Sequence, residues 1–311
     1  MKRLFILLVV LGLSPLGVLD AKPEESLGLP NGDGVIRGMA GGSEIVVRTS
    51  ARTAGAICSV VWRGKEFIDA TDHGRELQSA SNFDVDGEIK GETFNPTEGG
   101  SRDDSAGPSS TSRLLYLHAA GAELVTTNQM AFWLLPGEKS EGNLAKNTTA
   151  LSNHLLSKRV RIGVTNFPHA LEYRVTFTLP KDERHVHGVF EALTGYMPIE
   201  FDDFWVFDLG SRKLISVSKD LREDVLPLVF STKDGAYAMG IYSPPDAKLP
   251  KRTYGRFRFD WAKVTKWNCV FRINDAKGIA PGDYSCRMFV MVGTLEDVRG
   301  TMDGLCRAEG A

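Results

Sequence analysis

The sequence is poor in cysteine and in net charge, and each shortage excludes a class of protein. It has 4 cysteines in 311 residues, with no Cys-x-x-Cys pair and no cysteine–histidine cluster of the kind that holds zinc. Its 37 basic and 39 acidic side chains give a formal net charge of −2, whereas a nucleic-acid-binding domain usually presents an excess of basic charge. We therefore expect neither a cysteine-based zinc site nor nucleic acid as a partner.

Long apolar runs are also scarce, and the clearest one lies at the N-terminus. Lys2 and Arg3 precede about a dozen mostly apolar residues that Ser14 and Pro15 interrupt, whereas a membrane-spanning helix needs about 20. This pattern is typical of a secretory signal peptide. We predict a signal peptide at residues 1–21 and a secreted or periplasmic protein with no stable membrane insertion after cleavage. The alternative is an uncleaved anchor.

Sustained helical periodicity and internal repeats are missing as well. Short segments rich in β-branched residues alternate in polarity and end at turn residues, for example 159–164 and 171–179, a pattern typical of half-buried strands. The one convincing helix follows Thr294, which can cap it, with Asp297 three residues later. Many strands, large loops and few short helices predict an all-β protein, a twisted antiparallel β-sandwich.

The length of the chain fits one large β domain after the processing segment. Residues 22–42 are rich in glycine, proline and charge and indicate an N-terminal arm. Residues 43–311 then form a single β-sandwich domain in our prediction. Within it, residues 84–112 hold few large apolar side chains, and so long a loop in a compact domain is usually functional or disordered.

Two of the cysteines suggest a disulfide. Cys269 and Cys286 lie in two strand-like segments separated by a loop that contains Gly278, Pro281 and Gly282. If the two segments pair as an antiparallel hairpin, the cysteines fall nearly opposite each other, and an oxidising compartment favours their disulfide. We predict this pairing, the alternative being four buried, reduced thiols.

Residues 56–68, which read Ala-Ile-Cys-Ser-Val-Val-Trp-Arg-Gly-Lys-Glu-Phe-Ile, and residues 72–78 resemble the opening of galactose mutarotase-like domains. Residues 171–193, two alternating strands across a Pro-Lys-Asp turn, are similar to the middle of that fold. The resemblance implies a supersandwich whose concave face binds carbohydrate, in a family that includes sugar epimerases. Related sandwiches occur in polysaccharide lyases and glycoside hydrolases. Residues 195–205 lack the histidine that mutarotases place there, so sugar binding is implied more firmly than epimerisation.

The densest polar cluster lies in residues 72–78 and 95–101. Histidine transfers protons near neutral pH, and arginine offers a fork of donors to a carboxylate or to sugar hydroxyls. Aromatic rings further along the chain can stack on sugars or can simply fill the core. We predict catalytic roles for His73, Glu98, Tyr196 and Asp203, and substrate-binding roles for Asp72, Arg75, Gln78, Asn95, His187 and Trp205. The alternative for this cluster is a structural ion pair beside an ordinary turn.

No metal site is predicted. His185 and His187 share one strand face in the expected pattern, but the sequence names no further ligand beside them. Asp84, Asp86 and Glu88 offer oxygen ligands of the kind that calcium takes. Calcium is therefore the one cofactor that the sequence leaves open.

These residues predict a secreted carbohydrate-active enzyme that acts on a polysaccharide in a concave sheet cleft. A glycoside hydrolase would place two carboxylates about the scissile bond, such as Glu98 with Asp203 or Glu92. A polysaccharide lyase would use His73 or Tyr196 as the base that removes a proton beside a uronate carboxylate. The alternatives are a noncatalytic carbohydrate-binding protein of the same fold and a sugar epimerase.

Overall fold

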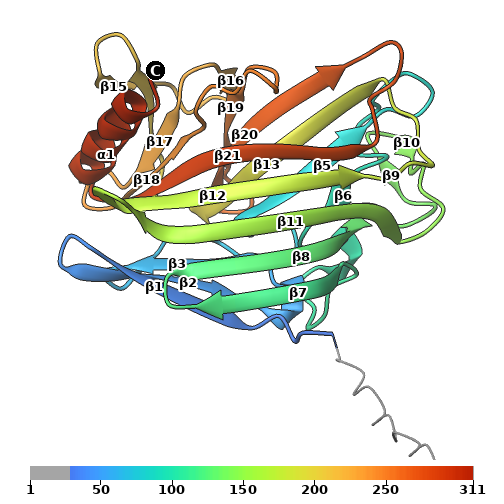
Figure 1. The fold of residues 1–311 in the computed structure, drawn as a ribbon, viewed down its shortest axis with the longest axis horizontal. Coiled ribbons are helices and arrows are strands. Elements are labelled where there is room, and N and C mark those ends of the chain that lie inside the picture. Colours follow the sequence, from blue (N-terminus) through green and yellow to red (C-terminus); the bar gives the residue numbers. More distant parts are fainter. Residues whose placement is uncertain (1–28, 311) are drawn as a thin grey trace, which may run out of the picture.

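The computed structural model describes residues 29–310 and shows an antiparallel β-sandwich (Figure 1). The predicted signal peptide at residues 1–21 and the first part of the predicted arm lie outside the described residues. The longest ladders of the sandwich are all antiparallel. The predicted fold class is therefore confirmed.

The strands of residues 29–310 form three sheets. A four-stranded sheet contains, in spatial order, β1 (Gly34–Ala40), β2 (Ser43–Thr49), β3 (Ile57–Trp62) and β4 (Lys65–Glu66). The large sheet contains, in spatial order, β15 (Lys213–Ser216), β14 (Asp203–Asp208), β17 (Leu228–Ser231), β18 (Ala238–Tyr242), β21 (Gly282–Gly293), β12 (Phe167–Leu179), β11 (Leu151–Val164), β8 (Glu123–Phe132), β6 (Pro96–Thr97), β5 (Gln78–Phe83), β13 (His187–Pro198), β20 (Val264–Asn274), β19 (Thr253–Phe259) and β16 (Arg222–Asp224), and β7 (Arg113–Ala120) pairs with β8. The remaining elements are the hairpin of β9 (Lys139–Ser140) and β10 (Asn143–Leu144), the 3-10 helices η1 (Ala51–Thr53) and η2 (Arg102–Asp104), and the helix α1 (Leu295–Ala308).

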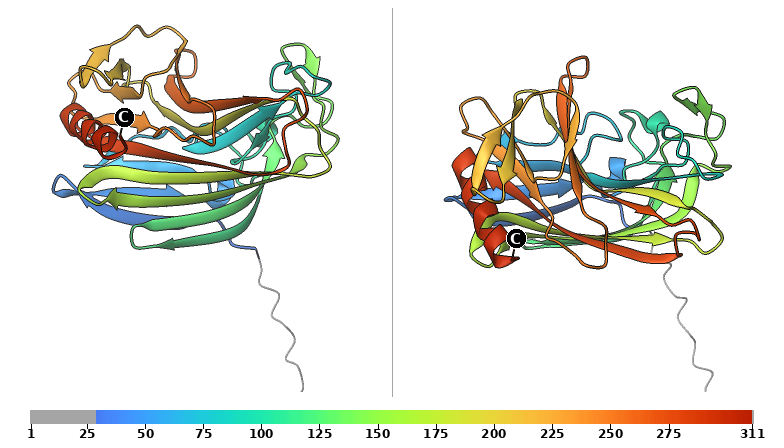
Figure 2. Two further views of the ribbon diagram at one scale, coloured as in Figure 1. Left: turned by 45° about the horizontal axis from the view of Figure 1, so that its top comes forward. Right: turned by 90° about the horizontal axis from the view of Figure 1, so that it is seen from above.

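The short strand β6 lets the large sheet turn back on itself. Its residue Thr97 pairs with Ala131 of β8 on one side and with Ala80 of β5 on the other. The layer that contains β11 and β12 then faces the layer that contains β13 and β20 (Figure 2). Phe177 of β12 and Phe190 of β13 meet in the core between them, with ring centroids 5.2 Å apart.

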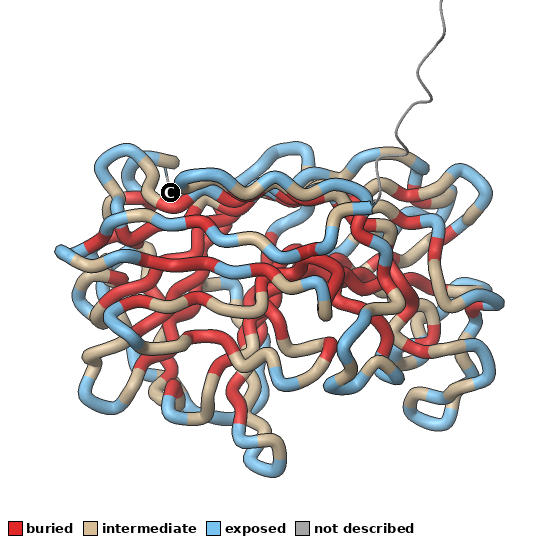
Figure 3. The backbone as a smooth tube through the Cα atoms, turned by 90° about the horizontal axis from the view of Figure 1, so that it is seen from below, coloured by how far each residue is buried: buried red, intermediate tan, exposed pale blue. Residues whose placement is uncertain are grey.

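Strands β11 and β12 show why the predicted alternation produces a sandwich. Val160 and Tyr173 are buried, whereas Arg159 and Arg174 point to solvent. Successive side chains point to opposite faces of a strand, so one face of these strands packs on the core and the other is hydrated. Figure 3 shows the same division along the chain, with buried segments through the middle of the molecule and exposed loops at its edges.

Helix α1 closes one edge of the sandwich beside β12, β18 and β21 (Figure 1). The backbone N–H of Asp297 donates to the Thr294 hydroxyl (3.1 Å), and the Asp297 carboxylate accepts from the Thr294 backbone N–H (3.0 Å). This reciprocal cap is the one that the sequence predicted. No helix within residues 29–310 is long and apolar enough to cross a membrane.

Two sequence predictions differ from the fold in their boundaries. Residues 34–40, placed in the N-terminal arm, form β1 and pair with β2 over seven register positions. The sequence pattern also predicts two strands at 122–128 and 129–135, whereas the structure has the single strand β8 from Glu123 to Phe132. In both cases partner strands extend the pairing beyond what the local pattern indicated.

The predicted cysteine hairpin is wrong. Strand β20 pairs with β13 and β19, whereas β21 pairs with β12 and β18. The loop between β20 and β21 hydrogen-bonds to the segment that precedes β13. Its backbone N–H groups at Asp275 and Ile279 donate to the carbonyls of Val186 and His185. The loop thus carries the chain from one layer to the other, and all four cysteines are free thiols.

Candidate functional site

Two adjoining hollows lie where residues 69–75 cover one end of β5, β13 and β20. The larger has a volume of about 380 Å³ and the smaller about 80 Å³, and both are lined by Gly74, Trp133 and Tyr196. We call the two hollows together the cleft. The side chains that give it its chemistry are Asp72, Arg75, Gln78, Glu92, Asn95, Arg102, Trp133, Glu191, Thr194, Tyr196, Phe259, Trp261 and Lys266.

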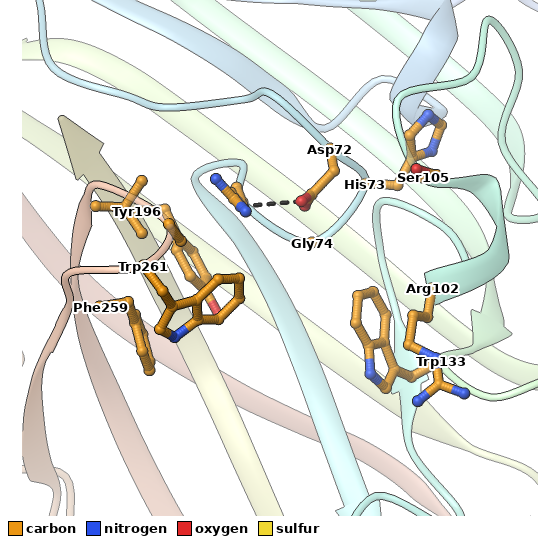
Figure 4. A pocket seen from close by; sticks show the side chains of 12 residues that line it. Asp72, His73, Gly74, Arg102, Ser105, Trp133, Tyr196, Phe259 and Trp261 are labelled. Carbon is orange, nitrogen blue, oxygen red and sulfur yellow. Dashed lines mark ion pairs between the residues drawn. The ribbon is translucent and has the colours of Figure 1, made fainter. Parts of the chain in front are cut away.

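Aromatic rings stand on two sides of the cleft (Figure 4). Trp261 lies in the turn between β19 and β20 and is 83% exposed, an unusual state for so large an apolar side chain. Its ring contacts Phe259, with centroids 6.3 Å apart, and Phe259 in turn lies 6.4 Å from Tyr196. Trp133 lies across the cleft from Trp261, with Arg102 beside it. The two indoles therefore present flat apolar faces to whatever enters.

Gly74 allows Trp133 to take this position. A Cβ atom on residue 74 would lie 2.7 Å from Cη2 of the Trp133 indole, closer than real Cβ contacts. The backbone of residues 72–75 can therefore approach the ring only because residue 74 has no side chain. The Gly-Arg element of the sequence thus shapes the wall of the cleft.

The floor of the cleft is polar and charged. Tyr196 of β13 stands directly opposite Lys266 of β20 in the ladder, and the ammonium lies 5.2 Å from the centroid of the phenol ring. The Lys266 ammonium donates to Glu191 (3.3 Å), which also accepts from the amide of Asn268 (2.8 Å). A carboxylate, an ammonium and a phenol are thus held together on neighbouring strands.

A β-bulge in β13 brings these groups to one face. In a regular strand Glu191 would point away from Thr194 and Tyr196, because side chains alternate between faces. The pairing of β13 shifts between Glu191 and Leu193 on the side of β20, and between Glu191 and Thr194 on the side of β5. The extra residue turns Glu191 to the cleft, and bulges often re-aim side chains in this way beside active sites.

The charges of the floor shift one another's pKa values. Burial by itself would lower the pKa of Lys266, but Glu191 and Tyr196 outweigh it and raise that pKa. Burial raises the pKa of Tyr196, with Lys266 opposing the shift. The pKa of Glu92 is raised by desolvation among its neighbours and by the charge of Glu191, although its side chain still reaches solvent. Lys266 is therefore a fixed positive charge, and Glu92 holds its proton more readily than an ordinary glutamate.

Asp72 and Arg75, for which the sequence predicts substrate-binding roles, form one rim of the cleft. The Arg75 guanidinium lies 3.0 Å from the Asp72 carboxylate and 3.7 Å from that of Asp69 (Figure 4). Burial raises the pKa of Asp72, and Arg75 opposes this shift. The predicted residues Gln78 and Asn95 line the smaller hollow, where the Gln78 side chain accepts from the Gly99 backbone N–H (2.7 Å).

Two predicted catalytic residues turn their polar atoms into the fold, although the buried His73 borders the larger hollow (Figure 4). Each ring nitrogen of the buried His73 faces a backbone carbonyl, that of Gly99 at 3.1 Å and that of Gly107 at 3.0 Å. The buried Glu98 forms an ion pair with Lys158 and accepts from the backbone N–H of Ser79 (3.1 Å). Every polar atom of these two side chains already has a partner within the protein, so both side chains stabilise the fold and neither contacts a substrate.

Three other predicted residues lie elsewhere in the fold. Asp203 and Trp205 are on β14, and the Trp205 indole donates to the hydroxyl of Ser231 (3.0 Å). His187 begins β13, and its ring lies 2.8 Å from the side chain of Asn274. None of the three lines the cleft.

The acidic loop proposed for calcium is organised by backbone contacts. One oxygen of Asp84 accepts from the N–H groups of Val186 (2.8 Å) and His187 (2.6 Å), and the other accepts from Gly87 (3.0 Å). A carboxylate with these three donors has little capacity left for a cation.

Sequence reasoning missed Glu191, Lys266 and Trp261. A glutamate inside an apolar strand segment is one signal that could have been used for Glu191. A tryptophan in the polar turn 260–263 is a comparable signal for Trp261. The bulge that aims Glu191 has no comparable signature in the sequence.

Comparisons with known proteins give structural neighbours only. No protein-family model and no curated protein matches the chain. The structure is similar to the Slr1438 protein from Synechocystis sp. PCC 6803, with 10% identity and a TM-score of 0.42 over 84% of this chain and 96% of that chain. It is also similar to a protein in glycosyl hydrolase family 38 from Enterococcus faecalis, with 12% identity and a TM-score of 0.48 over 85% of this chain and 31% of that chain.

A third neighbour is a candidate aldose 1-epimerase from Klebsiella pneumoniae, with 12% identity and a TM-score of 0.43 over 91% of this chain and 93% of that chain. At 10–12% identity and TM-scores of 0.42–0.48, these likenesses carry no argument about a ligand or a reaction.

Proposed function

We propose that the cleft binds a carbohydrate between Trp133 and Trp261 and acts on it through the charged groups of its floor. The observation that carries the proposal is the pair of indoles across the larger hollow. This hollow shares Trp133 and Tyr196 with the smaller one, which Glu191 and Lys266 line. Indole faces suit the apolar CH faces of a sugar ring. An apolar ligand would bury the floor's charges without giving them partners, which is costly, whereas sugar hydroxyls would satisfy them.

Two carboxylates of the cleft suit different steps of a glycosidic reaction. Glu92, whose pKa is raised, suits the general acid that protonates the leaving oxygen. Glu191 accepts from the Lys266 ammonium and from the Asn268 amide, and a carboxylate held by these donors suits a base or a nucleophile. A pair in which one carboxyl group serves as the acid and the other as the base or nucleophile favours glycoside hydrolysis. In a lyase, Tyr196 beside Lys266 would be the base.

We also propose a polymeric substrate that the protein meets outside the cytoplasm. Trp261 stands at the rim and is 83% exposed, so it can stack on a sugar unit that extends beyond the hollow. Arg75 and Arg102 line the same hollow and can pair with the carboxylates of uronic acids. The signal peptide predicted at residues 1–21 would deliver the protein to such polymers.

The test is to incubate the purified protein with a panel of neutral and uronate-containing polysaccharides. New reducing ends and the ultraviolet absorbance of unsaturated uronides are followed together. Reducing ends without absorbance support hydrolysis, and both signals together support elimination. We expect Glu191→Gln to lose turnover, while Glu44→Gln, a surface carboxylate paired with Arg37, retains it.

Other outcomes would change the assignment. Saccharide binding without either signal would indicate the noncatalytic binding protein of the same fold. Interconversion of anomers, seen by polarimetry with a free sugar, would indicate the epimerase. Absence of binding across the whole panel would contradict the carbohydrate proposal itself.

A further inference from the structure

Two histidines and a glutamate converge at the other end of β13, away from the cleft. They are His154 of β11, together with Glu183 and His185 of the loop between β12 and β13. One oxygen of Glu183 lies 2.7 Å from Nε2 of His154 and 3.1 Å from Nε2 of His185. The three ligand atoms all lie within 4.8 Å of one another. His187, the partner that the sequence offered to His185, is not among them.

The hydrogen positions around His185 call for a positive charge in this cluster. Nδ1 of His185 lies 2.7 Å from the backbone carbonyl of Asp84, which can only accept, so Nδ1 carries a hydrogen. In a neutral ring Nε2 then carries a lone pair, and this lone pair faces the carboxylate of Glu183. Two acceptors in contact repel each other unless a cation lies between them.

The surroundings fix the two imidazoles in place. The ring of Phe83 stacks on His185 with centroids 4.8 Å apart and lies 5.1 Å from His154, and Phe94 covers His185 at 5.2 Å. Both histidines are buried. The carbonyl that orients His185 belongs to Asp84, whose carboxylate binds the backbone of the same loop. A ring nitrogen held by a backbone carbonyl is the usual outer support of a metal-binding histidine.

We propose that His154, Glu183 and His185 bind a divalent transition metal, zinc by its preference for such ligands. Two imidazoles and one carboxylate form a common three-ligand set for zinc, with water in the fourth position. Tetrahedral zinc holds such ligand atoms about 3.3 Å apart, and the two measured nitrogen–oxygen distances are shorter than this by about 0.6 Å or less. The Glu183 side chain is 21% exposed, so solvent can supply the fourth ligand.

The role of this ion is structural. Glu191, the residue of β13 in the cleft that lies nearest to the cluster, is four residue steps from His187, about 13 Å along the strand at about 3.3 Å per residue. A metal–ligand bond is only about 2 Å long, so the ion cannot bind a substrate at Glu191. It instead ties the loop between β12 and β13 to β11. The proposal is therefore independent of the proposed function.

The test is a calorimetric titration of the metal-stripped protein with zinc chloride. We expect one zinc ion per chain and a higher thermal unfolding temperature in its presence. The double variant His154→Gln with His185→Gln should lose affinity by roughly 100-fold or more. His187→Gln is the matched control, since its ring contacts Asn274 and lies outside the cluster, and it should bind as the unchanged protein does.

A second measurement does not depend on whether the double variant folds. Cobalt(II) bound to the unchanged protein should give the visible absorption bands of a tetrahedral site with nitrogen and oxygen ligands. If neither zinc nor cobalt binds the unchanged protein, or if zinc leaves its unfolding temperature unmoved, the positive charge is only a proton on the imidazoles. Either result would overturn the proposal.

Discussion

Among single residues, Trp261 bears most directly on the proposed carbohydrate binding. It is 83% exposed at the tip of the β19–β20 turn and contributes nothing to the core. We predict that Trp261→Ala weakens saccharide binding about tenfold, which is about 1.4 kcal/mol and within the range expected for aromatic stacking. Calorimetric titration with the best saccharide of the panel measures this.

The matched control for Trp261→Ala is Tyr116→Ala. Tyr116 of β7 is also an exposed aromatic residue, 51% accessible, and it lies outside the cleft. This variant should bind as tightly as the unchanged protein. Equal affinities for all three proteins would remove Trp261 from the proposed site.

Glu76 is the residue that should dominate the pH dependence of stability. Burial raises its pKa to about 8 from a usual 4.5, and neither carboxylate oxygen has a hydrogen-bond partner. The nearest cation is Arg52, at 3.9 Å. Between the two pKa values the unfolded chain loses this proton while the folded protein keeps it. The contribution of Glu76 to the free energy of unfolding is therefore complete below about pH 4.5. It falls as the pH rises toward about 8, by about 1.4 kcal/mol per pH unit.

We predict that Glu76→Gln removes this decline, because glutamine keeps the shape of the protonated acid without titrating. Urea unfolding at about pH 5 and about pH 8 measures the change in stability between the two conditions. The control is Glu44→Gln on the surface, which should follow the unchanged protein. The same decline in Glu76→Gln as in the unchanged protein would show that other groups cause it.

Among the elements, α1 offers the cleanest measurement, because its cap was predicted from the sequence and is present in the structure. Thr294→Ala removes the hydroxyl that accepts from the Asp297 backbone N–H and should cost about 1 kcal/mol of unfolding free energy. Thr294→Ser keeps that acceptor and should cost little. A loss of the same size in both variants would assign the effect to packing of the methyl group.

How much of the fold could be predicted from the sequence depends on the kind of element. The strands that alternate in polarity, such as 171–179, were recognisable because burial on one face leaves a period of two in the sequence. The path of the chain between Cys269 and Cys286 could not be predicted in this way. It depends on which strand pairs with each of the two segments, and local alternation does not specify that.

The sequence indicated residues of the cleft wall, such as Asp72 and Arg75, but not the floor residues Glu191 and Lys266. Residues 72–75 and Gln78 line the cleft, and the glycine with its polar neighbours marks a loop in the sequence that a ligand can approach. Nothing in the local pattern indicated where the side chains of His73 and Glu98 point, and both turn inward. Glu191 reaches the floor only through a bulge that depends on the pairing of β13 with its two neighbours.

At the scale of the whole molecule, the buried ion pair of Lys158 and Glu98 joins β11 to the turn that follows β6. We predict that Lys158→Met costs about 3–5 kcal/mol of unfolding free energy, because it leaves Glu98 buried without its cation. Arg159→Met is the control, since Arg159 pairs with Glu123 on the solvent face of the same strand and should cost about 1 kcal/mol or less. Urea unfolding measures both, and similar losses would contradict a special role for the buried pair.

The central claim concerns the cleft as a whole, in which the two layers, the loop 69–75 and the β19–β20 turn together make a place for a sugar. The most direct measurement is a crystal structure of the protein with the tightest-binding oligosaccharide of the panel. The account predicts a sugar ring between the indoles of Trp133 and Trp261, with a hydroxyl or glycosidic oxygen beside Glu191. An oligosaccharide bound elsewhere on the molecule, with the cleft filled by water alone, would contradict it.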